Sequence, residues 1–126
     1  MDYRTPLSKV RGLGSAKSGT AHWWLQRVTA VVLIPLTVWL LWLFKLSFYA
    51  PYQETAVWLS APLNSICLLA WIVAVFYHAA LGVQVVIEDY VAGDGSKIIA
   101  IWLVKLIFGV LALAASIAVF KVISAG

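Results

Sequence analysis

Charged residues are scarce in this sequence. Only 11% of its 126 residues are charged, whereas 63% are hydrophobic. Ordinary soluble domains carry about 25% charged residues. The composition therefore excludes an ordinary soluble domain and indicates a membrane protein.

Sulfur-containing residues are almost absent as well. Cys67 is the one cysteine and Met1 the one methionine. A lone cysteine forms no disulfide within its chain, and it cannot alone hold an iron–sulfur cluster or a structural zinc ion. The chain also has only two histidines, His22 and His78, so very few side chains could ligate a metal.

What the sequence does contain is three long stretches with almost no charge. Residues 28–44 and 56–87 carry none, and residues 98–120 carry only Lys105. A helix crosses the hydrocarbon core with about 20 apolar residues, and stretches this long and uniformly apolar do not suit a membrane barrel. We therefore predict an all-α membrane protein with three transmembrane helices, at about residues 23–48, 62–90 and 97–122.

The remaining segments divide the chain into two parts. Residues 1–22 are predicted to form a polar arm, and residues 23–126 the three-helix anchor domain. The arm is rich in Gly, Ser and Lys and lacks the layout of a cleavable signal peptide, so the first helix is interpreted as an uncleaved anchor. Pro35 lies inside that helix and is a candidate kink.

Positive charge is concentrated at the N-terminus. Arg27 lies just inside the first helix, the link at residues 49–62 contains no Lys or Arg, and four cations lie in the arm: Arg4, Lys9, Arg11 and Lys17. Cytoplasmic segments of membrane proteins carry an excess of Lys and Arg. We therefore expect a cytoplasmic N-terminus and a C-terminus on the far side. The charge is interpreted as an orientation signal, not as a nucleic-acid site.

His78 interrupts the second apolar stretch. Counting about 1.5 Å per residue back from Ile87 places it about 13 Å deep, near the bilayer centre. A buried polar side chain needs a partner. Three roles stay open for His78: a hydrogen bond to a neighbouring helix, ligation of a metal or haem, and a proton relay.

His78 shares one face of its helix with Gly82, Val85 and Asp89. At about 100° per residue, all three lie within about 40° of it. A glycine one turn from a histidine leaves room for a flat macrocycle, but close helix–helix packing explains Gly82 equally well. We expect this stripe to face a partner chain, with the first and third helices flanking the second.

A six-coordinate haem at His78 would need a second axial ligand. His22 lies at the membrane interface, well above His78, and Met1 is the initiator. If His78 binds haem, a partner subunit is therefore expected to supply the other ligand.

The second helix ends on Asp89 and Tyr90. Polar residues commonly end a span, yet an acidic residue at a helix C-terminus is slightly unfavourable with the macrodipole. That misfit hints at function. A tyrosine hydroxyl can donate a hydrogen bond to a quinone carbonyl, and a nearby carboxylate can move protons or hold an Arg or a water.

Two segments together resemble a known family. HAALGVQVVIEDYV, residues 78–91, resembles the second helix of the small hydrophobic membrane anchor of bacterial succinate dehydrogenase, with its His-x(3)-Gly-x(6)-Asp-Tyr pattern. HWWLQRVTAVVL, residues 22–33, is similar to the start of that family's first helix, where an Arg precedes a Thr-Ala step. With the chain length and the three spans, the resemblance covers most of the sequence.

The resemblance implies roles for individual residues. His78 would be an axial ligand of a b-type haem, and Gly82 would pack against that haem. Tyr90 would hydrogen-bond ubiquinone, with Asp89 supporting the site. Arg27 and His22 would lie near the haem propionates or the quinone pocket. No residue of the chain would be catalytic in its own right.

The resemblance also implies a division of labour. A flavoprotein subunit oxidises succinate, and an iron–sulfur subunit passes the electrons to the membrane face. Ubiquinone, bound between that subunit and two anchor chains, takes two electrons and two protons. This chain would be half of a heterodimeric haem-binding bundle with a cytochrome b anchor subunit, surrounded by lipid of the bacterial inner membrane, its C-terminus periplasmic. A trimer of the complex is compatible with this picture.

Three other functions remain as alternatives. The first is a haem-free anchor of the kind found in some fumarate reductases. The second is a small transporter or channel that oligomerises with itself, for which ionisable residues at matching depth on facing helices would be expected. The third is a structural scaffold without a ligand, for which His78→Leu would be harmless.

Overall fold

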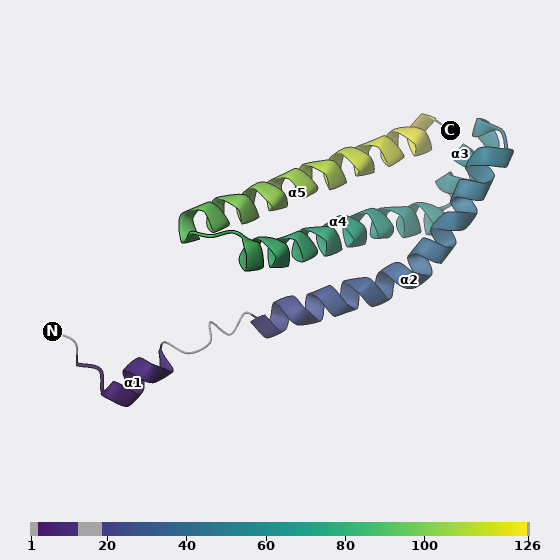
Figure 1. Cartoon of the computed structure of the whole chain (residues 1–126). Helices are drawn as coiled ribbons and strands as arrows, with labels where there is room; N and C mark the ends of the chain where they lie inside the picture. Colours follow the sequence, from purple (N-terminus) through teal and green to yellow (C-terminus); the bar gives the residue numbers. More distant parts are fainter. Residues whose placement is uncertain (1–2, 13–18, 126) are drawn as a thin grey trace.

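The computed structural model describes residues 3–12 and 19–125. Within these residues the chain is helical apart from short loops and contains no strand. Figure 1 shows three long helices lying side by side, with a short helix across one end of them. The elements, in chain order, are α1 (Pro6–Arg11), α2 (Gly19–Tyr49), α3 (Tyr52–Ser60), α4 (Pro62–Tyr90) and α5 (Asp94–Ala125).

Three helices are long and apolar enough to cross a membrane: α2 with 31 residues, α4 with 29 and α5 with 32. This confirms the predicted all-α, three-span fold. The predicted bounds of the second helix, residues 62–90, match those of α4. Pro62 occupies its first turn, where a proline loses no helical hydrogen bond because the first N–H groups have no partner in the helix.

The other two spans are longer than predicted. α2 begins at Gly19, not near Trp23, and α5 runs from Asp94 to Ala125, not from about Lys97 to Val122. Hydropathy marks only the apolar part of a helix, whereas backbone hydrogen bonding continues into polar flanks once a helix exists. Residues 19–22, assigned to the arm, are therefore part of α2. Lys17 of the arm lies outside the described residues.

The turn before α5 depends on Gly93. Its φ is +88°, in the region that residues with a side chain rarely adopt. Its carbonyl accepts the hydrogen bond of the Lys97 N–H at 3.0 Å. This places Gly93 at the start of α5 and folds the chain back after only three residues.

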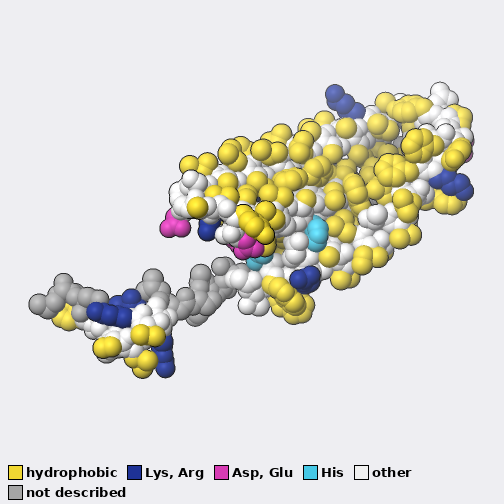
Figure 2. Space-filling view, in the orientation of Figure 1, with side chains coloured by type: hydrophobic (Ala, Val, Ile, Leu, Met, Phe, Trp, Pro, Cys, Tyr) yellow, Lys and Arg dark blue, Asp and Glu magenta, His cyan; other side chains and the backbone are white. Residues whose placement is uncertain are grey.

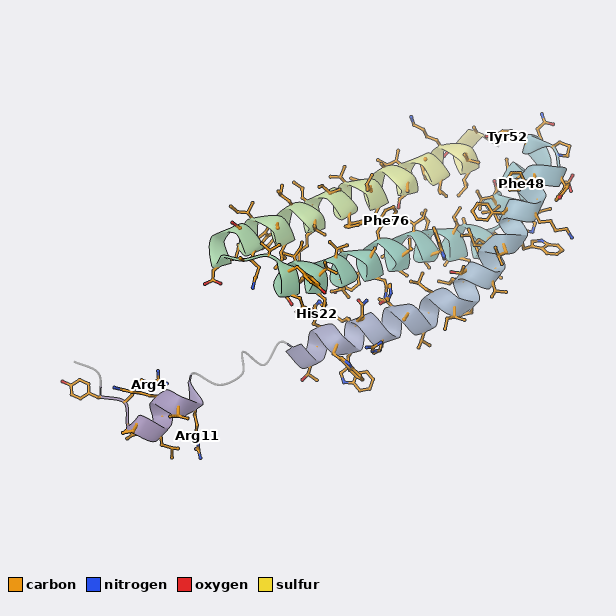
Figure 3. The ribbon with its side chains drawn as sticks, in the orientation of Figure 1. Arg4, Arg11, His22, Phe48, Tyr52 and Phe76 are labelled. Carbon is orange, nitrogen blue, oxygen red and sulfur yellow. The ribbon has the colours of Figure 1, made fainter. Side chains whose placement is uncertain are left out.

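α4 is the central helix of the bundle. It packs against α2 on one side and α5 on the other, and among the described residues α2 and α5 do not pack against each other. Phe76 of α4 meets Phe108 of α5 with ring centroids 6.2 Å apart (Figure 3). The prediction that the first and third helices flank the second is confirmed.

The best-packed region lies at the end of the bundle that α3 closes. Trp39 of α2 stacks on Trp58 of α3 with ring centroids 5.6 Å apart. Five buried side chains form the core there: Leu40, Leu43, Leu59, Leu68 and Ile72. Toward the opposite end the buried side chains are Leu81 and Ile87 of α4, whereas α2 buries none before Leu40.

Two short helices, α1 and α3, were not predicted. α3 occupies most of the link between the first two predicted spans and buries Ala56 and Leu59 against the bundle. α1 lies in the arm, where the Thr5 hydroxyl accepts a hydrogen bond from the Ser8 N–H and Pro6 follows as the first helical residue. This Thr-Pro combination is a typical helix start.

Candidate functional site

His78 meets α2 through Thr29. Its ring nitrogen Nδ1 lies 3.0 Å from the Thr29 hydroxyl oxygen, and the contact is partly buried. The same hydroxyl lies 2.7 Å from the carbonyl oxygen of Leu25 and 3.1 Å from that of Gln26, in the preceding turn of α2. The other ring nitrogen, Nε2, has no hydrogen-bond partner in the described part of the chain. One nitrogen of His78 is thus engaged, and the other is available.

The α2–α4 interface has a regular antiparallel register. Gln26 lies beside Gly82, Thr29 bonds His78, and further along the Trp71 Nε1–H donates to the Thr37 hydroxyl at 3.0 Å. As the residue number of the contact rises on α2, the residue number of its partner on α4 falls by a similar amount. Polar contacts of this kind between membrane helices hold one helix in a defined rotation against another.

Gly82 lies at this helix–helix contact. A Cβ at Gly82 would be 3.7 Å from the Gln26 side-chain nitrogen, an ordinary van der Waals distance. His78 and Gly82 both turn toward α2 of the same chain, and that a partner chain also faces the His78–Gly82–Asp89 stripe stays a prediction. The periodicity of one helix cannot tell which neighbour its polar face meets. His78 is only half-buried, and Asp89 is exposed.

Arg27 and His22 take different sides of α2. Arg27 is two positions from Thr29, about 200° around the helix, and its guanidinium carbon lies 5.5 Å from the ring centroid of Trp23. His22 lies on the side that faces α4 (Figure 3). Its Nε2 is buried without a hydrogen-bond partner among the described residues, as is the side-chain oxygen of Gln26. The fold therefore brings His22 toward α4 but not Arg27.

Asp89 and Tyr90 are the last two residues of α4, and both are exposed. Asp89 is exposed, and 84% of the Tyr90 surface is accessible. Tyr90 lies twelve residues beyond His78, about 18 Å along the helix axis. The chain therefore does not bring these two residues together with His78. They form a second polar site at the end of the bundle. Figure 2 shows acidic side chains, in magenta, at this end.

Two hollows open on the helices near these residues. The first, called here the Thr29 hollow, has a volume of about 580 Å³ and runs between α2 and α4. Its lining is apolar apart from Thr29 and Tyr77, and it includes Ala74, one turn before His78. Figure 2 shows histidine, in cyan, reaching the viewed face among mainly apolar side chains.

The second, called the Lys105 hollow, has a volume of about 570 Å³. It lies over α4, with His22 and Leu25 from α2 on one side and Lys105 from α5 on the other. Lys105 is exposed, and its ammonium nitrogen lies 5.3 Å from the centroid of Trp102.

Sequence reasoning missed Thr29 and Gln26 as parts of the site. Both lie in the segment at residues 22–33, and a threonine on a neighbouring span at a depth similar to that of His78 was the available signal. In the described ranges, no three His, Cys, Asp or Glu side chains come together. His78 is thus a single ligand-type side chain beside the Thr29 hydroxyl, and it does not itself line either hollow.

Comparison with protein families gives a match over nearly the whole chain. Residues 1–119 match the model of the family described as "Succinate dehydrogenase/Fumarate reductase transmembrane subunit". No solved structure gave a significant match.

Several individual proteins are similar to the chain. A succinate dehydrogenase hydrophobic membrane anchor subunit of Rickettsia bellii is 43% identical over 117 residues, which cover 92% of each chain. A succinate dehydrogenase membrane anchor subunit of Reclinomonas americana is 36% identical, over 72% of this chain and 78% of its own length. The corresponding subunit of Paracoccus denitrificans is 29% identical, over 93% of this chain and 89% of its own.

Proposed function

The chain belongs to the succinate dehydrogenase/fumarate reductase transmembrane subunit family, and on that premise we propose that it shares a b-type haem with a second anchor subunit and helps to form the ubiquinone-reducing site. As a family member with three apolar helices, it is a multi-pass membrane anchor subunit of succinate dehydrogenase. The catalytic oxidation of succinate belongs to other subunits of such a complex.

The observation that carries the haem proposal is the state of His78. It is half-buried in the central span, and its Nε2 has no partner among the described residues. The adjoining Thr29 hollow is almost wholly apolar, and its volume of about 580 Å³ is within the usual range of about 300–1,000 Å³ for cofactor sites. The lining residues, which include Thr29 but not His78, are as apolar as a flat macrocycle requires, and His78, one turn beyond Ala74, would supply one imidazole ligand. When bound, haem supplies a one-electron iron couple.

The second axial ligand is assigned to the cytochrome b anchor subunit. His22 is the other histidine of the chain, but it lies seven residues before Thr29, about 10 Å along α2. His22 lines the Lys105 hollow, and no contact joins the two histidines in the described part of the chain, so the second ligand is proposed to come from the partner. The buried, unpartnered Nε2 of His22 suits a hydrogen bond to a haem propionate or quinone instead. The same role is proposed for Arg27, once a partner subunit packs on its side of α2.

Tyr90 and Asp89 are proposed to serve ubiquinone. Tyr90 exposes 84% of its surface at the end of α4, so its hydroxyl is free to donate a hydrogen bond to a quinone carbonyl. Asp89, beside it, can hold a proton or a water for the reduction, which consumes two protons. The iron–sulfur and flavoprotein subunits would dock at this end of the bundle.

The proposed setting is the bacterial inner membrane with a cytoplasmic N-terminus. The described part of the arm carries Arg4, Lys9 and Arg11 on or beside α1, and Arg27 follows in α2. The other end of the bundle carries fewer cations, since α3 contains none and only Lys45 of α2 and Lys121 of α5 lie near it among the described residues. This asymmetry supports the orientation by the positive-inside rule, and with that orientation Tyr90 would lie on the cytoplasmic side.

A reduced-minus-oxidised optical spectrum of the purified complex tests the haem proposal. We expect a b-type signal in the wild type that is lost or altered in His78→Tyr, because a tyrosine oxygen is a different iron ligand from an imidazole nitrogen. Succinate oxidation with an artificial acceptor serves as the control for assembly and should be unchanged. A wild-type complex without a haem band, or a band that His78→Tyr leaves intact, would contradict the proposal.

A haem-free anchor is a second candidate, and one observation favours it. The hydrogen bond between His78 and Thr29 already satisfies one ring nitrogen, as expected of a histidine that only joins two helices. In that case no haem band appears, and His78→Leu weakens the α2–α4 contact without any effect on electron transfer.

A further inference from the structure

We infer that Thr29 is a positioning residue for His78: it holds the imidazole with its proton on Nδ1, so that Nε2 presents its lone pair to the haem iron. The inference rests on the proposed function, since it assigns a role to a second residue of the same site. The family resemblance implies no role for Thr29 beyond its place in a sequence motif.

The Thr29 hydroxyl has a single proton to donate. Three groups lie within hydrogen-bonding distance of its oxygen: the carbonyl of Leu25 at 2.7 Å, the carbonyl of Gln26 at 3.1 Å, and His78 Nδ1 at 3.0 Å. The carbonyls can only accept. Because the contact with Leu25 is the shortest, the hydroxyl proton is assigned to it, in the i to i−4 bond common for threonine in helices.

The contact with His78 then needs a proton from the other side. With its own proton given to Leu25, the Thr29 oxygen can only accept, so Nδ1 must carry the hydrogen. The opposite assignment would leave the Thr29 and Leu25 oxygens 2.7 Å apart with no proton between them. A neutral imidazole with hydrogen on Nδ1 has its lone pair on Nε2, the nitrogen that no described residue engages.

The same α2–α4 interface contains an independent example of this arrangement. Trp71 donates its ring N–H to the Thr37 hydroxyl at 3.0 Å. An indole N–H can only donate, so Thr37 is an acceptor toward α4 without ambiguity. Thr29 and Thr37 thus play parallel parts, each accepting from a ring N–H of the neighbouring helix.

The hydrogen bond has consequences for a metal at Nε2. An acceptor on the far nitrogen fixes the ring orientation and the tautomer and makes the ligating nitrogen more basic. A more basic ligand favours ferric over ferrous iron and so lowers the midpoint potential of the haem. Thr29 is therefore expected to affect both how firmly the haem is held and how easily it is reduced.

The test compares three variants of the whole complex. Thr29→Val removes the hydroxyl at nearly constant volume, Thr29→Ser keeps it, and Thr37→Val is the matched control that removes the equivalent bond to Trp71. The readouts are the midpoint potential of the haem, the low-spin ferric electron paramagnetic resonance signal, and the rate of haem loss to excess apomyoglobin.

We expect Thr29→Val to raise the midpoint potential, shift the resonance signal and weaken haem binding about 10- to 100-fold, the usual effect of removing an outer hydrogen-bond partner. Thr29→Ser and Thr37→Val should resemble the wild type. If the Thr29→Val complex does not assemble, Thr29→Ala removes the hydroxyl without adding a methyl group and gives the same comparison.

The outcomes separate this inference from the proposed function. A haem that His78→Tyr removes but Thr29→Val leaves unchanged overturns the inference alone. Equal shifts in Thr29→Val and Thr37→Val also overturn it, because they would reflect helix packing. A wild-type complex without haem overturns both.

Discussion

Arg27 and Thr29 are only two positions apart in the sequence, but they lie on opposite faces of α2. Thr29 accepts a hydrogen bond from α4, while Arg27 lies over Trp23 on the far side of α2. The difference follows from helical geometry, since two positions correspond to about 200°. Thr29 therefore lies in the α2–α4 interface within the chain, whereas Arg27 lies on a surface that is open to lipid or a partner.

Tyr90 allows a test of the quinone site at a single atom. Tyr90→Phe removes only the exposed hydroxyl, so we expect quinone reduction to fall about 10- to 100-fold, the scale of one lost hydrogen bond of about 1–3 kcal/mol. Succinate oxidation with an artificial acceptor should be unchanged. Tyr49→Phe is the matched control, because Tyr49 is equally exposed, at 86%, but ends α2 at the opposite end of the bundle. A parallel fall of both activities in Tyr90→Phe would make Tyr90 a structural residue.

The helices that were predicted correctly are those that a long apolar stretch of sequence marks. The uncharged stretches at residues 28–44 and 56–87, and the nearly uncharged one at 98–120, mark three spans, and Pro62 marks the start of α4. α3 could not be recognised in this way, because only Ala56 and Leu59 of its nine residues are buried and these make no long apolar run. Figure 1 shows α2 curving, as expected for a helix in which Pro35 leaves the Val31 carbonyl without its usual donor.

The faces of the helices were harder to predict than the helices themselves. His78, Gly82 and Asp89 were correctly placed on one stripe, since periodicity fixes that. The neighbour of the stripe depends on α2, whose Gln26 and Thr29 reach across to it. Such a contact is long-range in sequence, and a single sequence contains no direct record of it.

Gly82→Ala tests what the glycine does at the α2–α4 contact. The added Cβ would be 3.7 Å from the Gln26 nitrogen, an ordinary contact, and alanine favours a helix by about 1 kcal/mol over glycine. We expect assembly and thermal stability to be retained or slightly raised, and the haem spectrum to be unchanged. Gly82→Leu should destabilise the pair by displacing Gln26. If Gly82→Ala shifted the haem bands, a macrocycle would pack on Gly82, as the family resemblance implies.

The molecule as a whole is packed unevenly. A buried core joins α2, α3 and α4 at one end, whereas α5 has no buried residue along its 32 residues. Large apolar side chains are exposed along all three spans. Within a bilayer these faces contact lipid or another helix, and both hollows open among them. The architecture is that expected of one half of a larger helical bundle.

The orientation of the whole chain can be tested with its single cysteine removed. Ser96 and Ser124 are exposed near opposite ends of α5 and 28 residues apart, about 42 Å along the axis, which matches a bilayer with its headgroups. In a Cys67→Ser background, a membrane-impermeant maleimide should label Ser124→Cys in intact spheroplasts and Ser96→Cys only after lysis. The reason is the positive charge near the N-terminus, which holds that end, and hence the α4–α5 turn, in the cytoplasm. Cys67→Ser alone controls for background labelling. The reverse pattern would place the N-terminus and Tyr90 on the periplasmic side and would rule out docking of cytoplasmic subunits there.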